Sequence, residues 1–416
     1  MAFRLPIALV AFFCYCNNMT NKNKQIKKQT QIEVGYKFLY RFLKEVDALE
    51  NAIGSTMSTI RNDAKKYKKL HDRYINKFGE KEVTFAQFLE FEEIKESYIN
   101  NVIAGKILPR SLFIALIVYF ENFCKEQLKF NYKLFPKIIN ASGGTITNLE
   151  IQNFKNITDL KSHAVKKEIE AIMNDRMAYF DWYNKYLKLD LSKDQAYTRF
   201  VGISAKRNSF VHNDGVINDI YLNYLKKYGI KSKFKVGESI KLAPVDFFVS
   251  CAYVRAICIM TSYFSMKKYK KSNEDADNLL INLCVELNHK KKYLSTALTM
   301  ELIRKHFDKE CSIEFKKINL INHAVALKSM GSIKESKELV DSIDWSSSDP
   351  IYFLAVAAIK GKKVEIIKQM RILGSTKEMD QNYSTWPLFR DLRKKEFFKK
   401  SYREIFGKPF STKLIK

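Results

Sequence analysis

Glycine and proline are scarce in this chain, with 14 Gly and 7 Pro among 416 residues. Average usage is about 7% for Gly and about 5% for Pro, and both residues interrupt helices. The scarcity favours long helices and disfavours β-sandwiches, doubly wound sheets with glycine-rich loops, and collagen-like or proline-rich chains. Hydrophobic residues make up 46% of the chain, which is enough to build cores, and the length suits two or three domains. We expect an all-α fold with at most one small β-hairpin.

The chain is strongly basic, because 72 Lys and Arg residues outweigh 45 Asp and Glu residues to give a formal charge of +27. Clustered cations gain affinity for a nucleic-acid backbone by releasing counterions. Only 14 of the 72 basic residues are Arg, however, and Lys, Asn and Ile are abundant throughout. Biased codon choice in an AT-rich genome produces the same pattern. Charge alone therefore does not identify a nucleic-acid-binding protein.

The first residues, MAFRLPIALVAFFCYC, resemble the start of a signal peptide but are too short to span a bilayer as a helix. No small-residue cleavage site follows, and Phe13 stands where a lipoprotein signal needs a small residue. Met19 opens a polar stretch typical of a cytoplasmic amino terminus. We favour a start codon assigned too far upstream, with residues 1–24 outside the folded chain and a cytoplasmic location. Export is the alternative.

The cysteines form no disulfide or metal framework. They contain no CxxC pair, and five of them lie far apart in apolar helical segments: Cys124, Cys251, Cys258, Cys284 and Cys311. Such thiols are typical of buried positions in a reducing compartment. The six histidines show no HxH, HExxH or His/Cys cluster. The sequence therefore predicts no cofactor, no metal and no membrane span.

Residues 25–104 are predicted to form a helical arm. Apolar residues recur at three- and four-residue steps between Gln25 and about Phe78, which is typical of an amphipathic helix in a hairpin or a dimer contact. Thr84 and Gln87 have the spacing of a capping box at the start of the next helix.

Residues 105–270 are predicted to form a buried bundle. Pro109 is expected to open an apolar helix from Arg110 to Leu128. Further helices are expected from about Asp159 through Tyr179, up to His212, and from Pro244 through Phe264. Residues 141–145 are expected to be a loop, and residues 233–242 a β-hairpin.

Residues 275–416 follow a solvated linker at 267–275 and contain shorter helices in pairs. Residues 319–340 and 352–373 each have the pattern helix, Gly-containing turn, helix. The pattern resembles tetratricopeptide-like hairpins, although the full consensus is absent. A terminal basic helix bearing Trp386 and Tyr402 is predicted to cap this array rather than to stack on nucleic-acid bases.

The most informative segment is Arg207-Asn-Ser-Phe-Val-His212, which ends a helix immediately before the stop signal Asn213-Asp-Gly215. It resembles the R-x4-6-H motif of the HEPN superfamily, which contains metal-independent ribonucleases and inactive relatives in bacterial toxin and anti-phage systems. The apolar helices before and after the motif also fit this resemblance, which covers roughly residues 105–270.

The chemistry of the motif follows from its residue types. Metal-independent RNA cleavage needs a base for the ribose 2′-OH, an acid for the leaving 5′-oxygen and a cation for the charge on phosphorus. A histidine can act as acid or base near neutrality, and an arginine donates a planar fork to phosphate oxygens. Five helical positions separate Arg207 and His212 by about 140°, so the two do not share a face of an ideal helix.

The resemblance implies a homodimer that joins two motifs in one cleft and yields 2′,3′-cyclic phosphate and 5′-hydroxyl ends. Arg207 and His212 are then the catalytic residues, with Asn208 and Glu121 in support. RNA is the expected substrate, and a protein or nucleotide trigger is expected to bind the carboxyl-terminal helices. The alternatives are an inactive HEPN scaffold that binds a protein or nucleotide, and an Arg/His pair that merely caps a helix. The other histidines are interpreted as structural.

Overall fold

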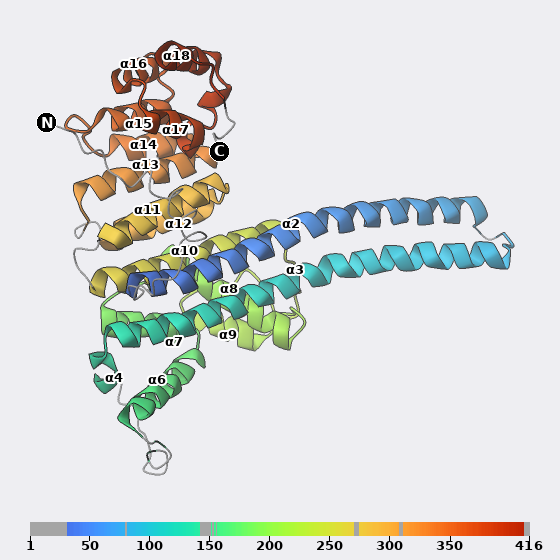
Figure 1. Ribbon diagram of the computed structural model, residues 1–416. Helices are drawn as coiled ribbons and strands as arrows, with labels where there is room; N and C mark the ends of the chain where they lie inside the picture. The colour runs from blue at the N-terminus through green and yellow to red at the C-terminus, as the bar shows by residue number, and fades with distance from the viewer. Residues whose placement is uncertain are drawn as a thin grey trace. The chain divides into compact units, whose positions relative to one another are not determined.

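The computed structural model describes residues 31–79, 81–141, 151, 154, 156–269, 274–307 and 311–411 (Figure 1). The chain forms two compact units, one made by residues 34–258 and the other by residues 259–416 together with the segment before residue 34. It passes from the first to the second inside one long helix. No β-strand occurs in the described ranges, which contain a single antiparallel bridge between Val216 and Ser239. The prediction of an all-α fold is confirmed.

Residues 34–258 contain two very long helices and a set of shorter ones. These are α2 (Gln31–Phe78), α3 (Phe85–Leu134), α4 (Lys137–Ala141), α6 (Ile157–Met173), α7 (Ala178–Trp182), a π-helical turn η2 (Tyr183–Leu187), α8 (Gln195–His212), α9 (Asp219–Lys227) and the first part of α10 (Pro244–Tyr269). The predicted loop at 141–145, apart from residue 141, and the predicted amino-terminal start lie outside the described residues.

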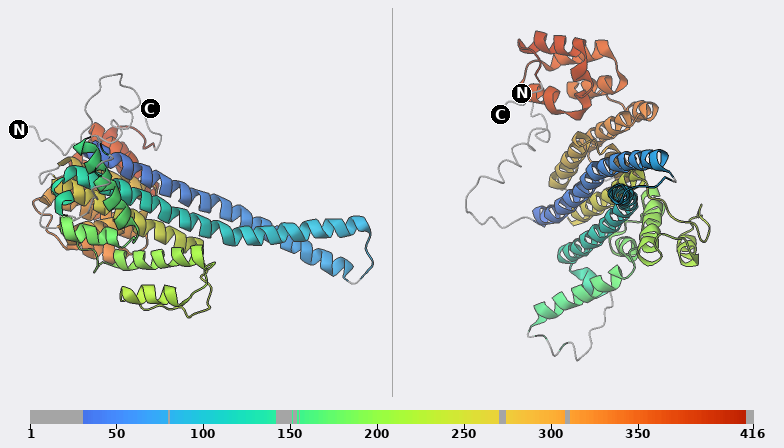
Figure 2. Two further views of the ribbon diagram at one scale, coloured as in Figure 1. Left: turned by 90° about the horizontal axis from the view of Figure 1, so that it is seen from below. Right: turned by 90° about the vertical axis from the view of Figure 1, so that its right-hand side faces the viewer.

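The helices α2 and α3 run antiparallel as one long hairpin, which extends beyond the other helices of its unit (Figures 1 and 2). A Cβ atom at Gly35 would lie 2.7 Å from the Phe130 ring, and one at Gly105 would lie 3.5 Å from Ile60. Near the tip, the Tyr74 and Phe91 rings are 5.1 Å apart. Residues later in α2 contact residues correspondingly earlier in α3. The two helices therefore keep one antiparallel register over their whole length. The amphipathic pattern of residues 25–78 therefore does predict one arm of a hairpin.

The capping box at the start of α3 is confirmed. The Gln87 amide donates to Thr84 Oγ1 at 3.3 Å, and Gln87 Oε1 accepts from the Thr84 amide at 2.9 Å.

The prediction that Pro109 begins a helix is wrong, because Pro109 lies inside the 50-residue helix α3. A proline in a helix interior removes one backbone hydrogen bond and strains the turn before it. Here the helix packs on α2 on both sides of Pro109, through Phe91 near the tip and Phe123 nearer the bundle. This packing outweighs the local cost, so the arm and the bundle share one continuous helix.

Two further predictions within the bundle are wrong. The helix expected from Asp159 to Tyr179 stops at Met173, because Asp175 accepts a hydrogen bond from the Met177 amide and turns the chain. The β-hairpin expected at 233–242 does not form. Its residues pair with the segment after α8 instead, and the Ile240 amide donates to the Gly215 carbonyl at 2.8 Å.

A buried charge cluster ties α10 to α2. The Arg255 side chain on α10 is completely buried and pairs with Glu50 at 2.9 Å and with Asp47 at 3.1 Å. A buried cation is tolerated only when it is paired in this way. This cluster and the aromatic contacts of Phe42 with Phe123 hold the base of the long hairpin.

The second unit is a series of helical hairpins. Its elements are α11 (Glu274–His289), α12 (Tyr293–Phe307), α13 (Ile313–Ser329), α14 (Ile333–Asp341), α15 (Pro350–Lys360), α16 (Lys363–Leu373), α17 (Lys377–Thr385), two 3-10 turns η4 (Pro387–Phe389) and η5 (Leu392–Lys394), and α18 (Glu396–Phe406). The pairs α13/α14 and α15/α16 turn at Gly331 and Gly361, both with positive φ, as predicted.

The carboxyl-terminal aromatic residues form the end of this unit's core. The rings of Trp386 and Phe389 lie 5.4 Å apart, and Phe398 and Tyr402 are buried beside them. Trp386 lies between α17 and η4, Phe389 lies in η4, and Phe398 and Tyr402 lie in α18, so they do not belong to the single helix we expected. Because they pack on one another, they act as a cap and present no open stacking platform.

Two helices, α3 and α10, are long and apolar enough to cross a membrane by length and composition. The apolar window of α10 is 89% buried within the protein and that of α3 is 22% buried. A core helix of a protein in water passes the same test, so these helices are weak evidence for a membrane span. The described cysteines are free thiols, four of them buried.

Candidate functional site

The segment with the Arg207–His212 motif is the last part of α8. Asn213 caps the end of the helix, where its amide donates to the Ser209 carbonyl at 2.9 Å, and the Gly215 amide donates to the same carbonyl at 3.0 Å. Gly215 has φ +79°, and a Cβ there would lie 2.9 Å from the Phe210 ring. Only glycine fits this turn, so the predicted stop signal is confirmed and α8 ends at His212.

Arg110 of α3 holds this turn in place. Its guanidinium Nη1 pairs with the Asp214 carboxylate at 2.7 Å and donates to the Asp214 carbonyl at 3.2 Å. The same guanidinium lies 5.4 Å from the centre of the Phe210 ring. Because α3 fixes the turn in this way, the last residue of α8 has a defined position despite its exposure.

Arg207 faces the interior of the bundle and joins a half-buried polar network. Its Nη1 donates to Asn208 Oδ1 at 3.4 Å, and Arg176 donates to the same oxygen at 3.1 Å. Arg176 also forms an ion pair with Glu121 of α3 and donates to Ser204 Oγ at 3.4 Å. Two guanidinium groups, one from α8 and one from the turn between α6 and α7, therefore surround a single amide oxygen.

The charges of this network do not balance. Two guanidinium groups face one nearby carboxylate, that of Glu121, and burial together with Arg176 lowers the pKa of Arg207 from its ordinary value. Arg207 Nε is buried and has no hydrogen-bond partner among the described residues. An anion beside Arg207 would satisfy this donor and offset the excess positive charge.

His212 is exposed at the end of α8, and within the described residues its side chain contacts neither Arg207 nor an acidic group. The predicted separation around the helix therefore applies, and one copy of the chain does not form an Arg/His pair by itself. Asn208 contacts Arg207 as proposed. Glu121 contacts Arg176 and not the motif arginine directly.

Sequence reasoning missed two of the residues around α8, Arg110 and Arg176. Neither belongs to a recognisable motif, and their partners are far away in the chain, at Asp214 and Glu121. The one available signal was composition. Because only 14 of the 72 basic residues are arginines, an arginine indicates a position where the planar guanidinium with its several donors is needed and a lysine would not serve.

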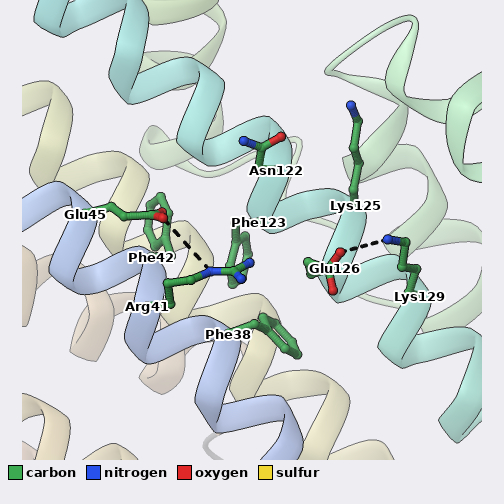
Figure 3. Close-up of a pocket in the computed structure, with 9 residues that line it drawn as sticks. All are labelled: Phe38, Arg41, Phe42, Glu45, Asn122, Phe123, Lys125, Glu126 and Lys129. Atoms are coloured by element: carbon green, nitrogen blue, oxygen red, sulfur yellow. Dashed lines mark hydrogen bonds and ion pairs between the residues drawn. The ribbon is translucent and has the colours of Figure 1, made fainter.

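A groove lies between α2 and α3 (Figure 3). It measures ≈ 430 Å³ and is lined by Phe38, Phe42 and Phe123 and by basic and acidic side chains. Lys129 already pairs with Glu126 at 2.8 Å, and Arg41 lies 4.0 Å from Glu45. Since two of the three basic side chains already have a carboxylate nearby and the aromatic residues serve the helix contact, we assign no ligand to this groove.

A pocket of ≈ 490 Å³ lies between α12, α13 and α14. Apolar side chains dominate its wall, with Arg304, Asn319 and His323 among them. Both amide atoms of Asn319 are buried and lack a hydrogen-bond partner in the described part of the chain. Burial and the charge of Arg304 lower the pKa of His323 to about 4, so its imidazole is neutral at physiological pH.

No group of three or more His, Cys, Asp or Glu residues that could hold a metal ion occurs in the described ranges. A scan of protein-family models, a search of curated proteins and a search of solved structures each find no match to this chain. Function therefore has to be argued from the residues and their geometry alone.

Proposed function

We propose that this protein is a metal-independent endoribonuclease of the HEPN type that acts as a homodimer. The observation that carries the proposal is the half-buried Arg207, which has an unpartnered donor and an uncompensated positive charge on the same helix that ends at the exposed His212. An exposed imidazole and a guanidinium suited to phosphate are the groups that this reaction requires.

The reaction proposed is transesterification at phosphorus. A neutral His212 removes the proton from a ribose 2′-OH, and the 2′-oxygen attacks the adjacent phosphorus. The bond from phosphorus to the 5′-oxygen breaks, and an imidazolium gives its proton to that oxygen. Arg207 stabilises the charge on the phosphoryl oxygens, and Asn208 holds Arg207 beside Arg176. The products are a 2′,3′-cyclic phosphate and a 5′-hydroxyl.

The homodimer supplies what one copy lacks. A single imidazole cannot be base and acid in the same step, and Arg207 and His212 of one copy do not contact each other. Two copies would provide two imidazoles and two guanidinium groups around one phosphate. In this proposal the protein is an effector of anti-phage defence or a toxin system, and the carboxyl-terminal hairpins restrain or trigger it.

The test compares wild type with His212→Ala and Arg207→Ala in cells and in purified form. We expect wild type to stop growth and to cleave RNA equally well with and without EDTA, and each variant to lose cleavage by at least two orders of magnitude. Lys226→Ala, a basic residue on the neighbouring helix α9 outside the network, is the matched control. Equal RNA integrity and growth for all four proteins would count against the proposal.

The pocket in the second unit favours a second candidate function, a scaffold whose carboxyl-terminal helices bind a nucleotide or protein. Asn319 offers a donor and an acceptor that have no hydrogen-bond partner in the described ranges, and Arg304 also lines the pocket. Calorimetry with a panel of nucleoside mono- and triphosphates, on wild type and Asn319→Leu, separates the candidates. Micromolar binding lost in the variant, together with no RNA cleavage by wild type, would favour the scaffold.

A further inference from the structure

Helix α3 has an apolar face that its own unit does not cover. Six large apolar residues of its distal half have 43–75% of their surface exposed, namely Phe85, Phe88, Leu89, Ile99, Ile103 and Ile107. At about 100° per residue, Ile99, Ile103 and Ile107 point roughly 150° away from Gly105, which contacts α2. The exposed stripe is therefore a second apolar face of α3 and not the edge of the hairpin contact.

The stripe continues as an exposed face toward the bundle through Ser111 and Val118, and reaches Lys125 and Lys129. In Figure 3 Lys125 extends away from α2, whereas Phe123 lies between the two helices. Soluble proteins rarely leave an apolar face of this length uncovered. A partner must therefore present a long, narrow and apolar surface of its own.

The charges along α3 indicate what that partner is. The part of the stripe near the tip of the hairpin also carries four glutamates, Glu90, Glu92, Glu93 and Glu96, against one lysine. The residues after it expose Lys125 and Lys129. Glu96 and Lys125 each lack an ion-pair partner within the residues that the structure describes, and no described ion pair joins α2 to α3. Lys129 pairs with Glu126 at 2.8 Å, so Lys125 is the cation that this end offers to a partner. An acidic end, an apolar middle and an unpaired lysine at the other end make the helix complementary to a reversed copy of itself.

We propose that α3 of a second copy of this chain packs antiparallel on this face. A two-fold axis near Arg110 and Ser111 places Ile103 opposite Val118 and Glu96 opposite Lys125. A parallel pairing would instead place glutamates opposite glutamates, which is destabilising. The antiparallel contact would extend from Glu92 to Lys129, about 55 Å at about 1.5 Å per residue. It covers Ile99, Ile103 and Ile107, whereas Phe85, Phe88 and Leu89 lie beyond its end.

The position of the axis connects this interface with the proposed site. Arg110 holds the turn that follows His212 through Asp214, so an axis at Arg110 brings the ends of both α8 helices toward each other. The inference thus rests on the homodimer of the proposed function and names its interface. Its test measures mass and cross-links, so it is independent of RNA cleavage.

The first measurement is solution mass by light scattering. The wild-type chain of 48.7 kDa should elute at about twice that mass. Ile103→Glu with Ile107→Glu should give a monomer with unchanged helicity. The matched control replaces Ile220 and Val245, which are 76% and 64% exposed on α9 and α10, by Glu and should leave the dimer intact. A wild-type monomer, or a dimer that survives the paired change in α3, overturns the proposal.

The second measurement fixes the direction of pairing. Glu96→Cys protein mixed with Lys125→Cys protein should form an intermolecular disulfide under mild oxidation, while either protein alone should remain at the wild-type background. A disulfide in the Glu96→Cys protein alone would indicate parallel pairing and overturn the proposal. Glu96→Lys should weaken the dimer at least tenfold, and adding Lys125→Glu should restore it. A confirmed dimer that cleaves no RNA would leave the interface standing and refute the nuclease.

Discussion

The ion pair between Glu121 and Arg176 is the contact on which the arrangement of Arg207 depends. The side chains of Glu121 and Arg176 are 22% and 14% exposed, so water screens their attraction only in part. Replacing Glu121 by Gln leaves Arg176 and Arg207 side by side with no carboxylate between them. Removing one partner from a fully buried pair costs about 3–5 kcal/mol, and the partial exposure here reduces this to about 2–3 kcal/mol.

Thermal unfolding followed by circular dichroism provides the assay. For a unit of this size each kcal/mol shifts the melting temperature by about 2–4 °C, so Glu121→Gln should lower it by about 4–12 °C. Glu126→Gln is the matched control on the same helix, because Glu126 pairs with Lys129 at the surface and its side chain is 40% exposed. That change should cost less than about 1 kcal/mol.

A double-mutant cycle tests whether the loss of stability comes from the unpaired charge of Arg176. Changing Arg176 to Met together with Glu121→Gln removes both charges, so the double variant should be more stable than the sum of the two single effects by about 1–3 kcal/mol. It should still bind RNA less well than wild type, because Asn208 loses a donor that fixes it beside Arg207. If Glu121→Gln destabilises no more than Glu126→Gln, or if the two single effects simply add, the network does not hold Arg207 as argued.

Three further predictions concern stability. Gly215→Ala should lower the free energy of unfolding by about 1–3 kcal/mol, because Gly215 has φ +79° and no room for a Cβ. Gly202→Ala on α8, where a Cβ meets no other atom, should raise it by about 0.5–1 kcal/mol, and urea titration measures both. Glu50→Gln should cost about 3 kcal/mol in the same assay by leaving the buried Arg255 short of a carboxylate, and an effect below 1 kcal/mol would contradict this. The pKa of His323 is lowered to about 4 in the folded protein, so on acidification the unfolded chain binds a proton at this imidazole before the folded chain does. The contribution of His323 to the free energy of unfolding is therefore full above about pH 6.5 and falls by up to about 3 kcal/mol toward pH 4. His323→Gln should remove that part of the acid slope in a series of melting temperatures, and an unchanged slope would assign it to other groups.

Local signals in the sequence predicted the helices and several of their ends. The capping box at Thr84 and the stop at Gly215 depend on residues within a few positions of each other, and both form as expected. Two of the wrong predictions share one cause, which is that distant packing outweighed local preference. Pro109 remains inside α3 because α2 holds the helix on both sides, and the segment expected to form a hairpin pairs with Val216 instead.

The candidate site shows the same limit. The sequence indicates Arg207, Asn208 and His212 because they stand together at a helix end. It does not indicate that Arg176 would share Asn208 with Arg207, since the ion pair of Arg176 spans 55 positions to Glu121. Contacts between residues so far apart in the sequence depend on the whole fold, and no local pattern predicts them. Glu121 therefore pairs with an arginine that no local pattern marks, and not with Arg207 itself.

The continuity of α3 has a functional consequence if the dimer forms as proposed. Were Pro109 a helix start, the arm would be a separate element, and pairing of two arms would have no effect on the bundle. Because one rigid helix carries the apolar stripe, Arg110 and Glu121, a partner that packs on the stripe also fixes the residues that hold the end of α8 and the Arg207 network. The scarcity of helix breakers would then do more than lengthen the helices, since it would place the dimer contact and the residues that hold the proposed catalytic groups on the same helix.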